Sequence, residues 1–476
     1  MFTKKKKIIL TIIILTIISI IFFTSHTKYP KSEELDLSCN KCNLIFLNIE
    51  LLRADRVGLL NPNQKNTPYI DEFFNNSIIF ENAISPSGLT YISNLAIITS
   101  TEVFFNRHNP IYPANDGKLI IDYIPIIPEV LREKGYTTLG INVGNILKEV
   151  DPVSLMKRYN QNNQKIPELF NSVSDVIRRY KKQSPFFIHY RPSFLHYPYK
   201  RSINDLDTRK SSRYSSEYYG NIIELSIPPT SNTRIVSGPY NTTNKDDVKY
   251  KVIVNNISMN LTNSDIELVN NAYNDQIRYI DSKLKEIFKE LDQIQNTIVV
   301  LYANHGEGLF DNGIPNHGVG YQSNVHVPLI IKHPKIKEQI RIKKRISLID
   351  FIPTLYEMLN ISIKHKNQGI SLVPLIKNGQ YNRTYIYVGQ RDHYGGLESQ
   401  YEIIIKEDLK LYEKRMGISE LYNLSIDPKE LNNIFFSSND SQVNQLKIQL
   451  EKIKIESLEF RDEMKEYIKS ISQEVN

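Results

Sequence analysis

Four short segments, far apart along the chain, each place a metal-binding or nucleophilic side chain beside or just after an apolar run. Glu50 follows NLIFLNI, and Thr90 lies in SPSGLTYIS. His196 lies in FFIHYRPSFLHYPY, and Asn304 and His305 follow TIVVLYA. Parallel α/β sheets build their sites from loops at the carboxyl ends of strands, so we expect these residues to converge. A carboxylate, a hydroxyl, an amide and imidazoles together indicate a metal-activated nucleophile.

The elements that must position these residues alternate between strands and helices. The apolar runs predict strands at 43–49, 137–143, 185–190, 297–303 and 327–333. Helical spacing predicts helices at 68–76, 91–100, 126–135 and 274–294. This alternation indicates an α/β fold with a mostly parallel central sheet and helices on both faces.

Two regions depart from the alternation. Residues 201–262 are rich in Ser, Asn, Tyr and Lys with little periodicity, which predicts an insertion that shapes substrate choice. Beyond residue 380, short strand patterns and a helix near 440–470 predict a small antiparallel subdomain. We therefore expect an anchor and stalk over 1–35, a catalytic domain over 36–380 and a C-terminal α+β subdomain over 381–476.

The N-terminus predicts a membrane anchor. Four lysines, Lys4 to Lys7, precede the uncharged apolar run 8–23, which is long enough to approach a bilayer span. Because the lysines stand before the run, we expect a cytoplasmic N-terminus, a single pass through the inner or plasma membrane and an extracytoplasmic catalytic domain. A cleaved signal peptide is the alternative, although no small-x-small cleavage site follows.

Charge and cysteine content exclude other classes. The net charge of +7 includes six lysines within residues 1–31, so the remainder carries only +1. Nucleic acid is therefore not an expected partner. Cys39 and Cys42 form a CNKC without further ligands nearby, which favours a local disulfide over a zinc knuckle. His189, inside the strand FFIHY, reads as a core residue.

The order of the motifs resembles the sulfatase-like branch of the alkaline phosphatase superfamily. NIELLRADRVG resembles its opening motif, and the block TPYIDEFFNNSIIFENAISPSGLTYISNLAIITS resembles the one that carries the nucleophile. The late metal and substrate block of the family is similar to NTIVVLYANHGEGLFDNG and NHGVGYQSNVHVPLII. Its closing segments are similar to SLIDFIPTLYEMLNI, GISLVPLI and ELYNLSIDPKELNNI. The resemblance runs from about residue 43 to about 435.

The resemblance implies roles for six residues. Thr90 aligns with the nucleophile, and the ligands of one divalent cation would be Glu50, Thr90, Asn304 and His305. His196 and His317 match positions that bind the substrate or protonate the leaving group. Mixed nitrogen and oxygen ligands favour Zn²⁺ or Mn²⁺, with Ca²⁺ or Mg²⁺ as the other candidates. Arg53, Asp55, Glu307 and Asp311 are expected to form structural ion pairs.

Two departures from the family pattern shape the expected function. The segment Thr90 to Asn94 has no Cys, Pro or Arg, so formylglycine cannot form and phosphoryl chemistry is favoured over sulfate chemistry. Asn304 is neutral where most members carry Asp, which lowers the expected metal affinity. We expect a hydrolase or transferase that acts on phospholipid or envelope glycan esters through a covalent threonine intermediate. The alternatives are a sulfuric ester hydrolase without formylglycine and a catalytically weakened binding protein.

Overall fold

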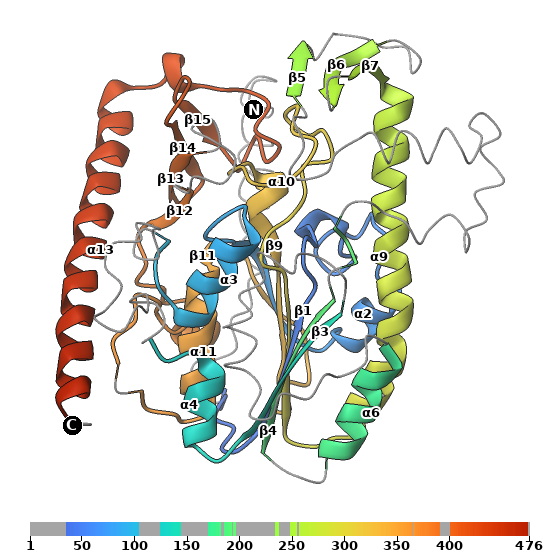
Figure 1. The fold of residues 1–476 in the computed structure, drawn as a ribbon, viewed down its shortest axis with the longest axis vertical. Coiled ribbons are helices and arrows are strands. Elements are labelled where there is room, and N and C mark those ends of the chain that lie inside the picture. Colours follow the sequence, from blue (N-terminus) through green and yellow to red (C-terminus); the bar gives the residue numbers. More distant parts are fainter. Residues whose placement is uncertain are drawn as a thin grey trace, which may run out of the picture.

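The computed structural model of the 476-residue chain describes residues 35–103, 124–143, 170–181, 185–192, 194–196, 234–237, 248–254, 257–363, 365–390 and 400–474. Within them, a twisted central sheet lies between two layers of helices (Figure 1). The predicted membrane span of residues 8–23 lies outside the described residues. Among the helices that are described, none combines the length and apolarity needed to cross a bilayer.

The central sheet has eight strands, seven of them in the order β10-β2-β9-β8-β1-β4-β3, with β11 paired to β2. All pairings are parallel except those of β9, which runs antiparallel to both β2 and β8. The predicted α/β fold with a mostly parallel sheet is confirmed. The strands are β1 (Asn43–Asn48), β2 (Ile78–Ile84), β3 (Thr137–Val143), β4 (Phe186–Pro192), β8 (Thr297–Tyr302), β9 (His326–Lys332), β10 (Ile340–Ile342) and β11 (Ile346–Ser347).

Helices cover both faces of this sheet. In Figure 1, α2, α6 and α9 lie on one side, and α3, α4 and α11 on the other. The long α9 begins earlier than its apolar pattern predicts, because Thr262 and Asp265 form a capping box at its N-terminus. These helices are α2 (Pro68–Phe73), α3 (Thr90–Thr99), α4 (Ile127–Glu133), α6 (Phe170–Tyr180), α9 (Asn263–Leu291) and α11 (Phe351–Met358). Shorter elements are α10 (Gln322–Val325), α12 (Val373–Asn378) and the 3-10 turns η1 (Ala54–Arg56), η4 (Leu348–Asp350) and η6 (Phe435–Ser437).

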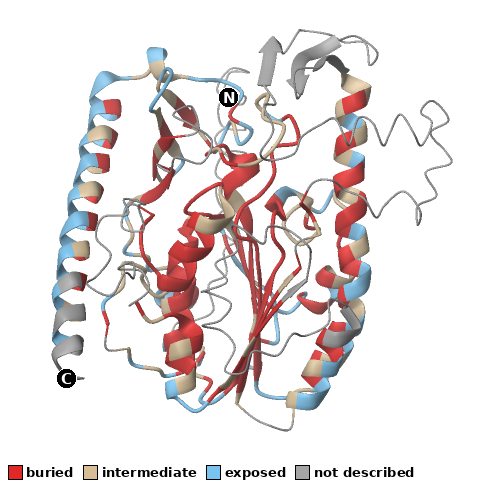
Figure 2. Cartoon of the chain, in the orientation of Figure 1, coloured by how far each residue is buried: buried red, intermediate tan, exposed pale blue. Residues whose placement is uncertain are grey.

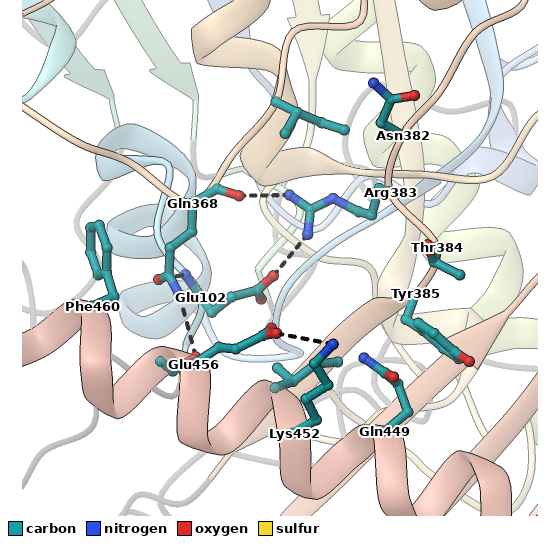
Figure 3. Close-up of a pocket in the computed structure, with 13 residues that line it drawn as sticks. Glu102, Gln368, Asn382, Arg383, Thr384, Tyr385, Gln449, Lys452, Glu456 and Phe460 are labelled. Carbon is teal, nitrogen blue, oxygen red and sulfur yellow. Dashed lines mark hydrogen bonds and ion pairs between the residues drawn. The ribbon is translucent and has the colours of Figure 1, made fainter.

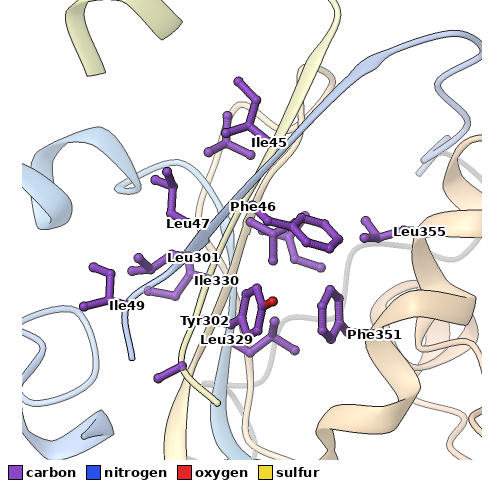
Figure 4. Packing of buried hydrophobic residues seen from close by; sticks show 14 of the residues in the cluster. Ile45, Phe46, Leu47, Ile49, Leu301, Tyr302, Leu329, Ile330, Phe351 and Leu355 are labelled. Carbon is purple, nitrogen blue, oxygen red and sulfur yellow. The ribbon is translucent and has the colours of Figure 1, made fainter. Parts of the chain in front are cut away.

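The core lies between the sheet and its helices, as the burial colouring shows (Figure 2). Every residue of β1 and β8 is buried, which explains why both strands read as continuous apolar runs. Phe46 packs edge-on against Phe187, with ring centroids 5.0 Å apart, and against Phe351 at 5.4 Å. Figure 4 shows Phe46 beside Phe351. This packing fixes the strands whose carboxyl ends carry the candidate site.

A second, antiparallel sheet follows the main one. Its strands, in the order β12-β13-β14-β15, confirm the predicted small C-terminal unit. The long α13 packs against it, and Figure 1 shows this helix along one edge of the molecule. The proposed domain boundaries stay predictions. The elements are β12 (Ile386–Gln390), β13 (Tyr401–Lys406), β14 (Leu409–Lys414), β15 (Glu420–Asn423) and α13 (Asp440–Glu474).

Two smaller sequence predictions can be compared with the structure. The aperiodic region 201–262 contains a three-stranded antiparallel sheet of β5 (Arg234–Ser237), β6 (Val248–Val254) and β7 (Ile257–Thr262). Most of that region lies outside the described residues, so its predicted effect on substrate choice stays a prediction. Cys39 and Cys42 form the expected local disulfide.

Candidate active site

The turn between β2 and α3 presents Thr90 at the first position of a helix. Gly88 is required there, because an added Cβ would lie 2.3 Å from the carbonyl oxygen of Val319. The turn is held on two sides: the Gly88 amide donates to the Tyr401 hydroxyl over 3.0 Å, and the Gly318 amide donates to the Gly88 carbonyl over 2.9 Å. Thr90 is thereby left half-buried at the positive end of the dipole of α3, which favours bound anions.

The hydroxyl of Thr90 is the meeting point of two other predicted ligands. Thr90 Oγ1 lies 2.9 Å from Glu50 Oε1 and 2.9 Å from His305 Nε2. His305 Nδ1 faces the Gly306 carbonyl oxygen at 2.9 Å, so Nδ1 carries the proton and Nε2 presents a lone pair. One hydroxyl proton therefore faces two acceptors. This surplus of lone pairs at one point is the arrangement that a cation would satisfy.

Paired strands bring Glu50 and Asn304 to neighbouring positions. Asn48 of β1 is in register with Tyr302 of β8, and each predicted ligand follows two residues later. Leu51 then adopts a left-handed conformation with φ 67°, which turns the chain directly after Glu50. The Tyr273 hydroxyl of α9 holds this turn by donating to the Leu51 carbonyl over 2.6 Å.

Asn304 itself is fully buried, and neither atom of its side-chain amide has a hydrogen-bond partner among the described residues. A buried amide without partners is costly, roughly 1–3 kcal/mol for each unpaired group. Its backbone carbonyl, in contrast, accepts a bond from Ser85 Oγ. The orphaned amide beside His305 is the second sign that the site is built to hold an additional group.

Three histidines form a row from the nucleophile outward. The rings of His305 and His317 lie 4.8 Å apart, and those of His317 and His196 5.2 Å apart. Burial, together with the nearby His317, lowers the pKa of His305 to about 3, so its imidazole is neutral. Burial alone would lower the pKa of His317 too, but the carboxylates of Glu307 and Glu50 outweigh it and raise that pKa. Glu307 Oε2 lies 3.3 Å from His317 Nδ1.

Arg191 is a member of the site that sequence reasoning missed. Its Nη2 lies 3.4 Å from Glu50 Oε1 and 3.3 Å from Oε2, and its side chain is 14% exposed. The guanidinium therefore neutralises the Glu50 carboxylate, which contacts Thr90, and competes with any cation for it. The available signal was an arginine directly after the buried run FFIHY, whose strand lies beside the strand that precedes Glu50.

The residues present fit a divalent cation. Glu50, Thr90 and His305 direct three donor atoms to one point, and Asn304, with its neutral amide, directly precedes His305 in the chain. Within the described ranges, no three His, Cys, Asp or Glu side chains lie close enough to hold a metal ion. A cation here would thus depend on a hydroxyl and an amide besides one carboxylate and one imidazole, which implies weak binding.

Other polar residues near these loops support the structure. Arg53 forms ion pairs with Asp55 and Asp311 at 2.8 and 2.6 Å, as predicted. Glu307 pairs with a site histidine instead of Arg53. His189 packs in the core beside Phe46, and burial lowers its pKa to about 3, in agreement with the prediction.

The α/β fold carries this cluster at the carboxyl ends of its strands, and comparison with known families identifies the class of protein. Residues 42–361 match the family model described as Sulfatase, and residues 308–456 match that of the C-terminal region of N-sulphoglucosamine sulphohydrolase. The first match covers more than half of the chain. The protein belongs to the sulfatase family.

Individual relatives agree with this assignment. An arylsulfatase of Clostridium perfringens is 30% identical over 199 residues, which is 40% of each chain. An N-acetylglucosamine-6-O-sulfatase of Bacteroides thetaiotaomicron is 28% identical over 169 residues, 32% of this chain and 29% of that protein. The chain thus matches well under half the length of these curated relatives.

Solved structures share the fold. A phosphonate monoester hydrolase of Agrobacterium radiobacter superimposes with a TM-score of 0.61 at 15% identity, covering 87% of this chain and 96% of that one. A protein bound to its substrate D-glucosamine-2-N,6-O-disulfate gives a TM-score of 0.61 at 17% identity, covering 89% and 98%. At these identities the likeness concerns the fold alone.

Proposed function

We propose that this protein hydrolyses or transfers a phospho- or sulfo-ester through a covalent intermediate on Thr90. The observation that carries the proposal is the position of Thr90 Oγ1, 2.9 Å from both Glu50 Oε1 and His305 Nε2 at the start of α3. A threonine hydroxyl is a weak nucleophile and requires a neighbouring base. Both neighbours present an acceptor atom to the hydroxyl, so either can take up its proton.

The proposed reaction has two displacements. Thr90 Oγ attacks phosphorus, its proton passes to Glu50 or His305, and the bond to the ester oxygen breaks. His317, whose pKa is raised by the carboxylates of Glu307 and Glu50, donates a proton to that leaving oxygen. Water or an acceptor alcohol then attacks phosphorus and restores the Thr90 hydroxyl, so the centre inverts twice.

A divalent cation fits the same cluster. Glu50, Thr90, His305 and Asn304 would hold it, with Zn²⁺ or Mn²⁺ favoured by the mixed ligands. When bound, it would lower the pKa of the threonine hydroxyl and neutralise charge on the ester oxygens. Arg191 and the N-terminus of α3 supply positive charge to the anionic ester from the protein itself.

Phosphate esters are our first choice of substrate because Thr90 cannot become formylglycine. Sulfate esters are the second candidate, and the sulfatase names of the curated relatives favour them. We further propose that residues 1–35 anchor the chain in the inner or plasma membrane, with the catalytic domain outside the cytoplasm. An anchored enzyme would meet phospholipid or envelope glycan esters.

A binding protein on the same fold is the alternative of another class, and Asn304 motivates it. If the natural chain does not bind a cation because the Asn304 amide is neutral, Asn304→Asp should raise metal affinity and create an ester hydrolysis that the natural chain lacks. If the natural chain already binds metal and hydrolyses an ester, the proposal that it is an enzyme is supported. Equilibrium dialysis with Zn²⁺ and Mn²⁺ on both proteins separates the two.

The activity test uses the full chain and four small esters of p-nitrophenol: phosphate, bis-phosphate, phenylphosphonate and sulfate. Thr90→Ala should abolish hydrolysis, whereas Thr90→Ser, which keeps a hydroxyl, should retain part of it. Unchanged hydrolysis in Thr90→Ala would refute the covalent threonine. Hydrolysis of the sulfate alone would transfer the assignment to the second candidate.

A further inference from the structure

Two cavities adjoin on the side of the molecule where the C-terminal sheet meets the main domain. The first, which we call the polar cavity, has a volume of about 460 Å³ and lies between α13 and the segment 382–385. The second, the basic cavity, has a volume of about 350 Å³ and lies between the segments 343–345 and 405–408. Both are lined by Arg383 and Thr384, so they meet at these residues.

The wall between them is rigid. Arg383 donates to both Asp350 oxygens over 2.6 and 2.9 Å, to Glu102 Oε1 over 3.1 Å and to the Gln368 carbonyl over 2.8 Å. Figure 3 shows the bonds from Arg383 to Glu102 and Gln368 inside the polar cavity. The charge of Arg383 is therefore matched by the Asp350 carboxylate, and the site's free charge must come from elsewhere.

The free charge lies on three lysines of the basic cavity. Lys343 and Lys344 are exposed and Lys406 is half-buried, and none of them has an ion pair among the described residues. Of the two arginines that also line this cavity, Arg383 is held as described above and Arg345 is paired with Asp408 at 2.7 Å; the carboxylate of Glu407 lines it as well. Since residues 32–476 carry a net charge of only +1, such a concentration of unpaired lysines in one concave site favours a ligand with several anionic groups.

The polar cavity offers groups that suit a sugar. Asn382, Thr384 and Gln449 present amides and a hydroxyl, and the rings of Tyr385 and Phe460 stand at its sides (Figure 3). Glu102 is 5% exposed, and its Oε2 has no hydrogen-bond partner among the described residues. That oxygen is enclosed by protein atoms, so the polar contacts that the cavity offers a sugar come from the two amides and the hydroxyl.

The cavities are separate from the nucleophile. Ile386 at the start of β12 lines the basic cavity, and the Gly389 amide of the same strand donates to the Pro86 carbonyl in the turn before Thr90 over 3.0 Å. Three residues of strand span about 10 Å. On the other route, Glu102 lies beyond the C-terminal end of α3, whose ten residues span about 15 Å. One small ester cannot reach both places, but a polymer can.

We propose that the two cavities form a secondary binding site for an anionic glycan, whose hydroxyls enter the polar cavity and whose phosphate or sulfate groups contact Lys343, Lys344 and Lys406. The proposal rests on the proposed function in one respect: the same polymer would carry the ester cleaved at Thr90. It therefore makes the substrate a chain of several units bearing repeated negative charges.

Binding of dextran sulfate oligosaccharides to the full chain tests this proposal. All proteins carry Thr90→Ala, so that turnover plays no part. Substituting Gln at Lys343, Lys344 and Lys406 should weaken binding at least tenfold. A control with the same charge change, Gln at the exposed Lys134, Lys289 and Lys337, should change it less than twofold. Thr384→Trp, which obstructs the junction of the cavities without altering charge, should also weaken binding.

Three results would overturn the proposal. They are equal losses in the two triple variants, full binding by Thr384→Trp, and binding of phosphatidylglycerol vesicles through the same three lysines as tightly as the glycan. Neutral dextran serves as the uncharged probe and should bind at least tenfold more weakly than dextran sulfate. Hydrolysis of p-nitrophenyl phosphate by the natural Thr90 protein is measured separately. Glycan binding without hydrolysis would refute the proposed function alone, and hydrolysis without binding would refute the secondary site alone.

Discussion

The ion pair between Lys410 and Glu430 should make a large contribution to the stability of the fold around the site. Both side chains are fully buried. Lys410 Nζ also donates to the Gly320 carbonyl over 2.6 Å, and Glu430 Oε2 accepts from the backbone N–H of Gln322 over 2.6 Å. The pair thus joins the C-terminal sheet to the segment that follows His317.

Replacing Lys410 by Met leaves the Glu430 carboxylate buried without its cation. Burial lowers the pKa of Lys410 and raises that of Glu430, in spite of their mutual attraction, which shows how costly desolvation is here. Breaking one partner of such a pair costs about 3–5 kcal/mol. With a urea m value of about 3 kcal/mol/M, the unfolding midpoint should fall by roughly 1 M or more.

Urea unfolding followed by circular dichroism measures this effect. The double variant Lys410→Met with Glu430→Gln removes both charges and should recover at least half of the lost stability. Lys366→Met is the surface control, since that lysine and its partner Glu463 are 71% and 54% exposed, and it should cost less than about 1 kcal/mol. Equal losses in the single and double variants would refute the reasoning, because the unpaired charge would then not be the cause.

Three other predictions follow from the described contacts. Arg191→Gln frees Glu50 and should tighten Zn²⁺ binding about tenfold in equilibrium dialysis, whereas Arg191→Lys should not; tighter binding in both would contradict the charge argument. Burial raises the pKa of Glu102 from 4.5 to about 7 although Arg383 is adjacent, so the folded protein binds a proton at Glu102 more tightly than the unfolded chain does. The stabilisation from protonated Glu102 is complete below pH 4.5 and is lost as pH rises through 7. The free energy of unfolding of the wild type should therefore fall by about 2–3 kcal/mol relative to Glu102→Gln over that range, measured by urea unfolding; a difference between the two proteins that stays constant with pH would exclude the raised pKa. Phe46→Ala should lower the free energy of unfolding by about 3–5 kcal/mol in the same measurement, because the ring is buried. Phe436→Ala should change it very little, because Phe436 is 79% exposed, and similar losses in both variants would contradict the burial argument.

Strands with continuous apolar runs could be predicted closely, and 137–143 matches β3 to the residue. The strand before the nucleophile was missed because Glu81 and Asn82 interrupt the apolar run of β2 after three residues. The direction of β9 could not be predicted, since an apolar run reads the same in parallel and antiparallel strands. The early start of α9 had a readable signal, the Thr262 and Asp265 capping box, that its polar first turns obscured.

The candidate site could be assembled in outline from the sequence because each ligand follows an apolar strand. Glu50, Thr90 and His305 do meet, and the three histidines form a row. The contact of Arg191 with Glu50 depends on the pairing of Leu47 with Tyr190, a register that sequence alone does not specify. The orphaned amide of Asn304 depends on burial in the same way.

Peptide mass spectrometry after rapid acid quenching of the protein with p-nitrophenyl phosphate tests the central claim most directly. We predict that the peptide containing Thr90 gains a phosphoryl group, that the gain disappears in Thr90→Ala, and that it appears on Ser in Thr90→Ser. Release of p-nitrophenol with no modification of that peptide, or with the modification on another residue, would contradict the account.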